Sequence, residues 1–189
     1  SNLSVKMKVV EQVWNEFLSL GLKTIPKFPL WTDWWDREPS DNPQQYEKYT
    51  KWIDQNKEFY NKNIRKLRPW LMRSRKKPLW VGAVRKFEWQ AGDFDNDTMN
   101  TVLWSARGSG IRVKRPTYIP TLVAMSHVPV YGPESRTLSP RELLRMQSFP
   151  DTFEYDEKSI FKQVGNAVNV TMIERCAQFL IHDERLLEY

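Results

Sequence analysis

The stretch RTLSPRELLRMQSFPDTF, residues 136–153, contains the signals that begin and end a short helix. Ser139 suits the N-cap, Pro140 suits the first helical position, and Glu142 stands three residues after the cap. A serine and a glutamate at this spacing bond each other's backbone N–H groups and form a capping box. The pattern therefore predicts a helix that begins at Pro140 and closes at Phe149-Pro150.

A second informative stretch is FKQVGNAVNVTMIERCAQFL, residues 161–180, in which a short polar turn is followed by apolar residues at helical spacing. Gly165-Asn166 is predicted to turn straight into an amphipathic helix with apolar positions from Val168 to Leu180. Unpaired N–H groups and partial positive charge at a helix start attract anionic ligand groups. The turn therefore predicts a ligand contact, and the alternative that Asn166 is only a helix cap stays open.

Together, the two segments closely resemble the last two sequence motifs of the DNA cytosine-5 methyltransferases, in the same order and with a short gap between them. The first matches the family pattern R-x-L-(S/T)-P-R-E…Q-(S/G)-F-P-D, and the second matches Q-(I/V/F)-G-N-(A/S)-V. Upstream, SGIRVKRPTYIPTLVAM (109–125) resembles the passage that leads out of the family's target recognition domain. The resemblance covers residues 107–180 well and residues 3–106 loosely, as expected where target specificity is read.

The resemblance implies a reaction and a cofactor. Enzymes of this family flip the target cytosine out of the duplex, attack it with a cysteine thiolate, and transfer methyl from S-adenosylmethionine to ring carbon 5. In the family, the Gly-Asn turn contacts the amino-acid end of the cofactor, which implies cofactor contacts from Asn166, Ala167 and Val168. An asparagine amide and the N–H groups that open a helix suit a carboxylate.

The family places its catalytic cysteine in a Pro-Cys-Gln motif, its acidic partner in a Glu-Asn-Val motif, and the cofactor's methionine moiety against a Phe-x-Gly-x-Gly loop. None of these motifs occurs in this sequence. Cys176 falls on the apolar pattern of the last helix, so we interpret it as a buried small hydrophobe. We therefore assign no catalytic residue, and we expect the chain alone to be inactive. It would be either an excised portion of a one-chain enzyme, as the start Ser1-Asn2-Leu3 hints, or the smaller subunit of a split methyltransferase.

Candidate DNA contacts gather in and beside the segment Gly108-Ser109-Gly110, where glycines allow a close approach of backbone to a groove. Alternation along residues 111–115 predicts Arg112 and Lys114 on one strand face and the apolar residues on the other. Thr121 resembles the family's backbone-contacting threonine, and a satisfied strand hydroxyl is an equal alternative. Such residues bind phosphate more often than bases. The predicted DNA-binding residues are Arg107, Ser109, Arg112, Lys114, Arg115 and Thr121.

The N-terminal half predicts two helices followed by a small irregular sheet. Apolar residues repeat every four positions within residues 5–20, as in an amphipathic helix. A second helix is predicted to start near Pro43, with Asp41 or Asn42 as its cap, and Pro69 is expected to end or kink it. Short β-prone segments then follow. These predicted strands are RKFEWQ (85–90), NTVLWSAR (100–107), IRVKR (111–115) and TLVAMS (121–126).

Several other side chains leave two interpretations open. The basic run within residues 65–77 is either a solvated helix end and loop or a phosphate-contacting patch. The tryptophans at positions 31, 34 and 35 are predicted to lie in the core, with stacking or wedging against distorted DNA as the alternative. Glu88 or Gln90 has the chemistry to read a base edge. We predict a structural role for Arg141, Glu142 and Gln147.

Composition favours a polyanionic partner: 29 Lys and Arg face 23 Asp and Glu, which gives a formal net charge of +6. The one cysteine and two histidines offer no ligand set for a structural metal, so we predict none. The sequence has no run of 18 apolar residues and no signal-peptide pattern. We therefore predict a soluble, intracellular protein with no membrane partner, and the family resemblance implies the bacterial cytoplasm as its location.

The predicted fold is mixed α/β (α+β), with helical sections flanking a small irregular sheet. Its C-terminal helix would pack on a Rossmann-like methyltransferase domain absent from this chain and would expose an apolar face without it. Residues 3–135 would form the target recognition domain, and residues 136–189 would return to the catalytic domain. The implied partners are double-stranded DNA and a catalytic domain or subunit that shares S-adenosylmethionine. The alternatives are a non-enzymatic DNA-binding or regulatory module and, on charge and aromatics alone, an RNA-binding domain.

Overall fold

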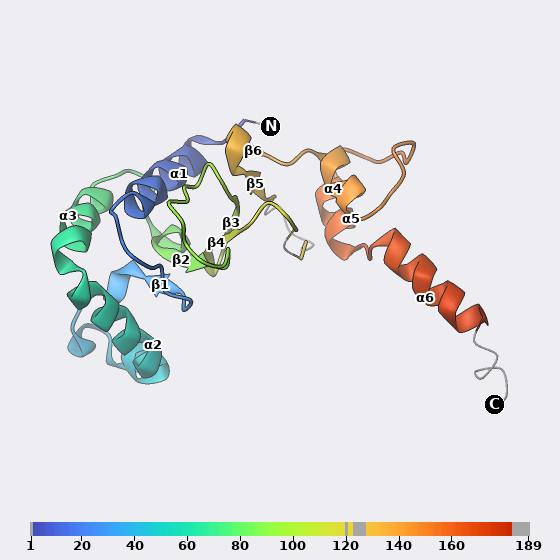
Figure 1. The fold of residues 1–189 in the computed structure, drawn as a ribbon. Coiled ribbons are helices and arrows are strands. Elements are labelled where there is room, and N and C mark those ends of the chain that lie inside the picture. The colour runs from blue at the N-terminus through green and yellow to red at the C-terminus, as the bar shows by residue number, and fades with distance from the viewer. Residues whose placement is uncertain (1, 120, 123–127, 183–189) are drawn as a thin grey trace, which may run out of the picture. The chain divides into compact units, whose positions relative to one another are not determined.

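The computed structural model describes residues 2–119, 121–122 and 128–182 (Figure 1). The chain forms two compact units. The larger unit contains Asn2–Tyr118 and Pro129–Thr137, and the smaller unit contains Ile119–Val128 and Leu138–Tyr189. Helices and strands both contribute, which confirms the predicted mixed α/β class.

The larger unit begins with helices at the predicted places. Helix α1 spans Val5–Leu18, and α2 spans Pro43–Lys62. Of the two predicted caps for α2, Asn42 is the one used, because its side chain accepts the Gln45 N–H at 3.1 Å. The local signals for these two helix starts were therefore sufficient.

The end of α2 differs from the prediction. The helix stops at Asn63, and Pro69 lies inside the next helix, α3 (Ile64–Arg75), so the prediction that Pro69 ends or kinks α2 is wrong. A proline inside a helix leaves the carbonyl one turn earlier without its intrahelical partner. Here Arg65 and Pro69 are both exposed, so water can bond that carbonyl. The opposite face of α3, which includes Leu67 and Trp70, is buried and holds the helix in place.

A six-stranded sheet forms the other layer of the larger unit, in the order β1-β2-β4-β3-β5-β6. Strands β2 and β4 run parallel, and all other neighbours are antiparallel. The strands are β1 (Leu30–Trp31), β2 (Lys86–Trp89), β3 (Leu103–Arg107), β4 (Gly110–Lys114), β5 (Val130–Tyr131) and β6 (Arg136–Thr137). The single-turn 3-10 helices are η1 (Thr32–Trp34), η2 (Pro39–Asp41), η3 (Gly82–Arg85) and η4 (Gly132–Glu134).

The strand predictions for residues 85–90, 100–107 and 111–115 are confirmed by β2, β3 and β4. The predicted strand at 121–126 lies mostly outside the described residues, and Thr121 and Leu122 belong to no strand. The two-residue strands β1, β5 and β6 were not predicted, because two residues carry no alternation to recognise.

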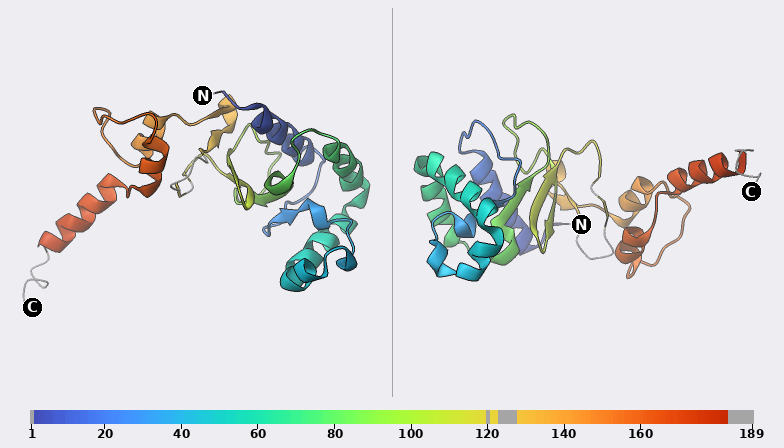
Figure 2. Two further views of the ribbon diagram at one scale, coloured as in Figure 1. Left: turned by 180° about the vertical axis from the view of Figure 1, so that it is seen from behind. Right: turned by 90° about the horizontal axis from the view of Figure 1, so that it is seen from below.

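Aromatic side chains join α1 to one face of the sheet. The ring of Trp14 on α1 stacks on Phe87 of β2 with the ring centroids 4.2 Å apart. The Trp14 indole N–H donates to the Val84 carbonyl at 3.0 Å, and the Trp70 indole N–H donates to the Val13 carbonyl at 3.1 Å. Figure 2 shows the helices of this unit on one side of its strands. The core therefore lies between the helices and this sheet face.

A buried asparagine organises the tryptophans near β1. Asn56 of α2 accepts the backbone N–H of Trp31 at 2.7 Å and the indole N–H of Trp35 at 3.1 Å through one oxygen. Its amide nitrogen donates to the carbonyls of Pro29 and Trp52, both at 3.1 Å. The tryptophans at positions 31, 34 and 35 are all buried, which confirms their predicted place in the core. They are not available to stack on nucleic acid.

Two glycines of the larger unit stand where no side chain fits. A Cβ at Gly132 would lie 1.9 Å from the Met99 carbonyl oxygen and 2.4 Å from that of Val102. Gly110 has a φ of +131°, and a Cβ there would lie 2.7 Å from the Lys86 Cβ. At both glycines, the backbone therefore packs directly against a neighbouring segment of the same polypeptide.

The smaller unit begins with α4 (Pro140–Met146). Its capping box is present as predicted: Glu142 donates its N–H to the Ser139 hydroxyl at 3.2 Å, and Ser139 donates its N–H to the Glu142 carboxylate at 2.7 Å. The helix ends at Met146, before the predicted Phe149-Pro150. Ser148 adopts a left-handed conformation with φ of 61°, and Phe149 donates its N–H to the Leu144 carbonyl at 3.0 Å. This is a Schellman ending, which usually uses glycine and was therefore not predicted from serine.

Candidate functional site

The sheet face opposite α1 carries the predicted DNA-binding side chains of β4. The predicted alternation is confirmed, because Ile111 and Val113 are buried while Arg112 and Lys114 are partly exposed. The ammonium of Lys114 lies 5.0 Å from the centre of the Tyr118 ring. Within β4, the cations therefore share one face, and the apolar residues of the strand enter the core.

Strand pairing brings an acidic side chain onto the same face. Glu88 of β2 stands directly opposite Arg112, and its Oε2 lies 3.1 Å from the Arg112 Nε. Gln90 donates to the other oxygen of Glu88. Burial lowers the pKa of the Arg107 guanidinium, the charge of Arg112 lowers it further, and Glu88 opposes both effects. The sequence named Glu88 and Gln90 as possible base readers but did not place them beside Arg112.

The other predicted DNA-binding residues lie in different surroundings. Ser109 is exposed in the turn between β3 and β4. Arg115 forms a bidentate ion pair with the nearly buried Asp97 and donates to the Asp93 carbonyl at 2.7 Å. The hydrogen bond to Asp97 raises the pKa of Arg115. The fold thus gives Arg115 a structural partner, whereas Thr121 is exposed and belongs to the smaller unit.

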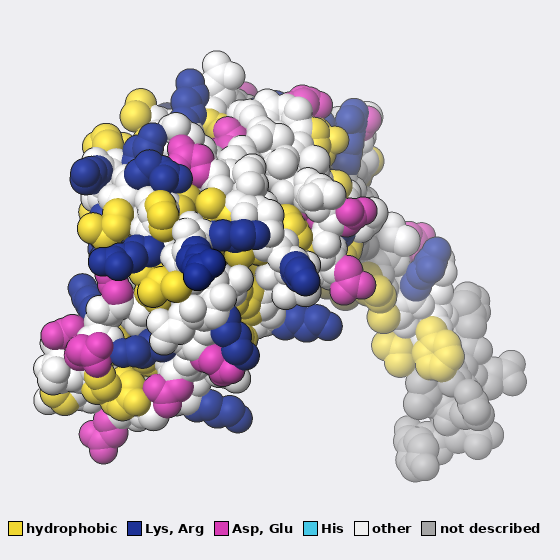
Figure 3. Space-filling model, turned by 60° about the vertical axis from the view of Figure 1, so that its left-hand side comes forward, with side chains coloured by type: hydrophobic (Ala, Val, Ile, Leu, Met, Phe, Trp, Pro, Cys, Tyr) yellow, Lys and Arg dark blue, Asp and Glu magenta, His cyan; other side chains and the backbone are white. Residues whose placement is uncertain are grey.

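The basic run on α3 divides into tied and outward-facing cations. Arg75 forms a bidentate pair with Asp36 at 2.6 and 2.7 Å, and Lys66 donates to the Gly21 carbonyl at 2.5 Å. The exposed cations of the run for which the described residues offer no partner are Arg65, Arg68, Arg73 and Lys76. Figure 3 shows Lys and Arg side chains interspersed with hydrophobic ones on the side of the molecule that turns α2 and α3 forward. Both interpretations of the run, solvated surface and phosphate contact, fit this exposure.

In the smaller unit, the Gly-Asn turn lies at the end of one helix and not at the start of the next. Gly165 and Asn166 are the last residues of α5 (Ile160–Asn166), and the Ala167 N–H donates to the Gln163 carbonyl at 2.9 Å. Helix α6 spans Val170–His182. The prediction that the turn runs straight into the amphipathic helix is therefore wrong, because a short extended link separates the two helices.

Asn169 caps α6, and Asn166 does not. The Asn169 side-chain oxygen accepts the Met172 N–H at 3.1 Å. Its nitrogen donates to the Met146 carbonyl at 3.2 Å and to the Ser148 hydroxyl at 3.0 Å, both at the end of α4. The cap interpretation of Asn166 is therefore wrong. An asparagine before a helical run is a start signal, but Asn166 and Asn169 both carry it, so the sequence alone does not choose between them.

Replacing Asn169 with alanine should loosen the first turn of α6. Loss of an N-cap side chain typically costs about 1 kcal/mol, and Asn169 also bonds the end of α4. Amide hydrogen exchange at Met172 and Ile173 is therefore expected to accelerate several-fold. The matched change Asn166→Ala should leave these amides unaffected. Equal exchange in the two variants would contradict the capping role.

Gln147 connects α4 to the link between α5 and α6. Its side-chain nitrogen lies 3.3 Å from the carbonyl oxygens of both Val164 and Ala167, and its own carbonyl accepts the Val170 N–H at 2.9 Å. The predicted structural role of Gln147 is thus confirmed. Arg141 lies 5.0 Å from the centre of the Tyr155 ring and 3.4 Å from the Pro150 carbonyl, so it also contacts its own unit.

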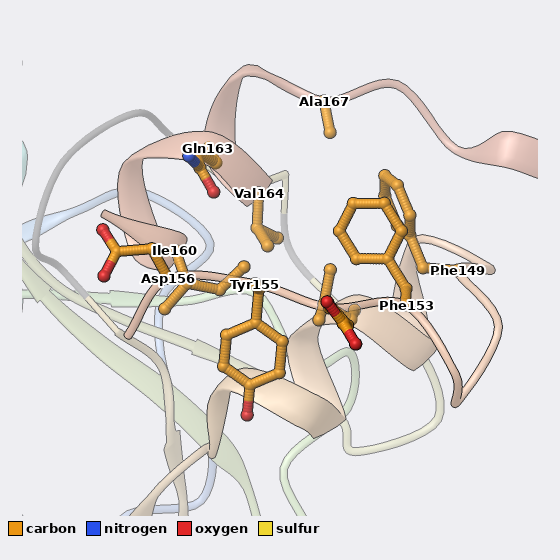
Figure 4. A pocket seen from close by; sticks show the side chains of 10 residues that line it. Phe149, Phe153, Tyr155, Asp156, Ile160, Gln163, Val164 and Ala167 are labelled. Carbon is orange, nitrogen blue, oxygen red and sulfur yellow. The ribbon is translucent and has the colours of Figure 1, made fainter. Parts of the chain in front are cut away.

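Two cavities flank this link, both within the smaller unit. The first is about 340 Å³, and Figure 4 shows Phe149 and Phe153 on one side of it and Val164 of α5 on another. It is lined by Leu144, Phe149, Phe153, Glu154, Tyr155, Asp156, Ile160, Gln163, Val164 and Ala167. The second, about 290 Å³, brings Thr121 together with Gly165 and Ala167. No spacing in the sequence indicated either cavity.

Helix α6 exposes its apolar side chains. Residues 171–181 are all exposed, and Phe179 and Ile181 retain 62% and 69% of their accessible surface. The predicted exposed apolar face is confirmed. The predicted burial of Cys176 is wrong, because Cys176 shares this uncovered face. An apolar face of this extent is typical of a surface that packs against protein.

Two kinds of feature are missing from residues 2–119, 121–122 and 128–182. No group of three or more His, Cys, Asp or Glu side chains is arranged to hold a metal ion. None of the helices there is long and apolar enough to cross a membrane.

Comparison with known proteins identifies the family. Residues 8–182 match the family described as C-5 cytosine-specific DNA methylase. Type II methyltransferase M.AluI from Cellulosimicrobium cellulans is 36% identical over 143 residues, which cover 71% of this chain and 26% of that relative. The chain thus spans about a quarter of that relative's length, and no solved structure matches it. Because the family match covers nearly all of the chain, this protein belongs to the C-5 cytosine-specific DNA methylase family.

Proposed function

We propose that this chain is the C-terminal, target-recognition part of a DNA cytosine-5 methyltransferase and acts together with a catalytic part. In this proposal, residues 3–135 form the target recognition domain that reads duplex DNA, and residues 136–189 return to the catalytic domain. The complete enzyme transfers methyl from S-adenosylmethionine to carbon 5 of cytosine. Its place of action is where bacterial DNA is found, the cytoplasm.

The exposed apolar face of α6 carries this proposal. Val170, Ile173 and Leu180 are 38%, 52% and 57% exposed, and they lie on one side of the helix. Burying the exposed part of each side chain contributes roughly 1 kcal/mol, so the face favours a protein partner. The family membership and the 26% coverage of M.AluI make a methyltransferase catalytic domain the occupant that we propose.

The link after α5 fits one wall of a cofactor site. Asn166 is exposed, and its amide offers both a donor and an acceptor to the zwitterionic end of S-adenosylmethionine. Val168 is 60% exposed and offers apolar surface to the cofactor's aliphatic chain. Ala167 joins the two and lines both cavities. When bound, the cofactor supplies the methyl group, and these three residues orient its amino-acid end.

The nucleophile, in this proposal, belongs to the catalytic part. Cys176 lies on the apolar face of α6 and outside any Pro-Cys-Gln motif, so it would be covered in the assembled enzyme. The DNA contacts proposed for this chain are Arg107, Ser109, Arg112, Lys114, Arg115 and Thr121.

The test is methyl transfer from labelled S-adenosylmethionine to mixed-sequence duplex DNA. The chain is assayed alone and mixed with a catalytic region expressed from the coding sequence upstream. Activity only in the mixture, retained by Cys176→Ser, is the expected result. Activity of the chain alone would show that the nucleophile lies within it. Inactivity of both samples with DNA binding intact would favour a non-enzymatic DNA-binding module.

A further inference from the structure

We infer that Arg112 reads a guanine in the major groove of the target duplex and that Glu88 positions it for this task. This inference rests on the proposed function, since it names a base that the recognition unit would select. It departs from the general expectation that arginines of this kind contact phosphates.

The ion pair holds the guanidinium beside Glu88 without a hydrogen bond, because the buried Nε–H of Arg112 has no hydrogen-bond partner among the described residues. Glu88 Oε2 lies 3.1 Å from Nε of Arg112, and the parallel register places the two residues directly opposite each other. The terminal nitrogens of Arg112 have no partner within the part of the chain that the structure describes. The planar fork at the end of the side chain therefore lies beside Glu88 and is still open to a ligand.

The carboxylate lies deeper in the protein than the guanidinium. The Glu88 side chain is 22% exposed, against 37% for Arg112. Gln90 donates to one oxygen of Glu88 and Arg112 faces the other, so both carboxylate oxygens have partners in the protein. Glu88 is therefore a positioning residue, and Arg112 is the group presented to DNA.

A carboxylate beside an arginine serves base reading better than phosphate binding. It reduces the net positive charge that a phosphate would meet, which works against the electrostatic contribution to backbone contacts. It also restricts the side chain before binding, so less rotamer freedom is lost when a directional contact forms. Base reading requires that direction, whereas a phosphate accepts donors from many angles.

Guanine is the base whose edge matches the open fork. Its N7 and O6 are two adjacent acceptors in the major groove, and arginine bonds both at once. Adenine presents a donor next to its acceptor, so one N–H of the guanidinium would face another donor. On the same face, Lys114 of β4 and Arg107 of β3 fit a polar target, and the buried Ser105 of β3 lies directly opposite Arg112.

The test measures base preference and not only affinity. The chain, alone and mixed with the catalytic part described above, selects sequences from duplexes with randomised positions. The variants are Arg112→Ala, Arg112→Lys and the nearly isosteric Glu88→Gln. Arg68→Ala is the matched control, because Arg68 is an exposed arginine on α3 away from this sheet face.

Arg112→Ala is expected to lose the preference for guanine at one position by roughly 10- to 100-fold and to retain the preferences elsewhere. Arg112→Lys should lose most of it, since a lysine cannot form the paired contact. Glu88→Gln should weaken preference at the same position only, and Arg68→Ala should lower affinity equally for all sequences or leave it unchanged.

A uniform loss of affinity in Arg112→Ala, with all base preferences intact, would overturn the inference and leave the proposed function standing. Unchanged preferences in Glu88→Gln would overturn the positioning role. If the wild-type chain binds no duplex DNA in either sample, the inference and the proposed function fail together.

Discussion

Replacing Gly132 with alanine is expected to prevent stable folding of the larger unit. The added Cβ would lie 1.9 Å from the Met99 carbonyl oxygen and 2.4 Å from that of Val102. The Val102 carbonyl cannot retreat without cost, because it accepts the Gly132 N–H at 3.0 Å. Severe backbone clashes of this kind cost about 4–5 kcal/mol or more, a large share of the roughly 5–15 kcal/mol by which a typical domain is stable.

The measurement is thermal unfolding followed by tryptophan fluorescence, together with the yield of soluble protein. Gly108→Ala is the matched control, since a Cβ there meets nothing within 4 Å. The control should unfold close to the wild-type temperature, and Gly132→Ala should show no cooperative transition. Indistinguishable transitions in the two variants would mean that the chain near Met99 can move aside.

Placing an aspartate at Ile173 or Leu180 is expected to eliminate methyl transfer in the mixed sample while leaving the chain itself folded. The two side chains are 52% and 57% exposed, so the change should have little effect on the chain alone. In the assembled enzyme, each substitution would remove roughly 1–1.5 kcal/mol of apolar burial and add the cost of burying a charge. We therefore expect at least a 100-fold loss of activity at a fixed concentration of the catalytic part.

Gln178→Asp is the control for this pair, because it introduces the same charge on the polar side of α6. Methyl transfer, co-purification of the two parts, and DNA binding by the chain are measured for each variant. Full activity of Leu180→Asp would separate α6 from assembly and remove the main support for a docking role. Loss of DNA binding along with activity would indicate damage to the chain instead.

Local signals predicted local structure well. The capping box of Ser139 and Glu142, the cap at Asn42 and the burial alternation of β4 all depend on neighbours a few residues apart. The confirmed features are those in which one short segment contains every interacting group. Patterns of apolar spacing therefore located most of the longer elements.

The failures at Pro69 and Ser148 have local causes, whereas the failure at Asn166 depends on a contact between distant segments. Pro69 does not break its helix because the exposed side can bond water, whereas Asn63 ends α2 without any proline. Ser148 takes a left-handed conformation that glycine usually supplies. Asn166 and Asn169 are both plausible caps by type, and only the contacts of Asn169 with the end of α4 decide between them.

The sequence identified residues of the candidate site, but it did not predict how these residues pair with one another. Arg112 was identified from strand alternation, but its pairing with Glu88 depends on the parallel register of β2 and β4. The partner of Arg115, Asp97, likewise lies in a distant loop. Such pairings depend on long-range topology, which no spacing within either segment encodes.

The order of the strands has a consequence for synthesis on the ribosome. The edge of β3 is covered by β5, and Asn2 pairs with Arg136, yet residues 129–137 emerge only after the segment Ile119–Val128 has been made. At a typical translation rate, that edge would wait about 1–5 s for its partner. Unpaired strand edges recruit other chains during such delays. A polypeptide that stops at Tyr118 would keep the edge of β3 unpaired. A recognition module transplanted into another enzyme should therefore continue through Thr137.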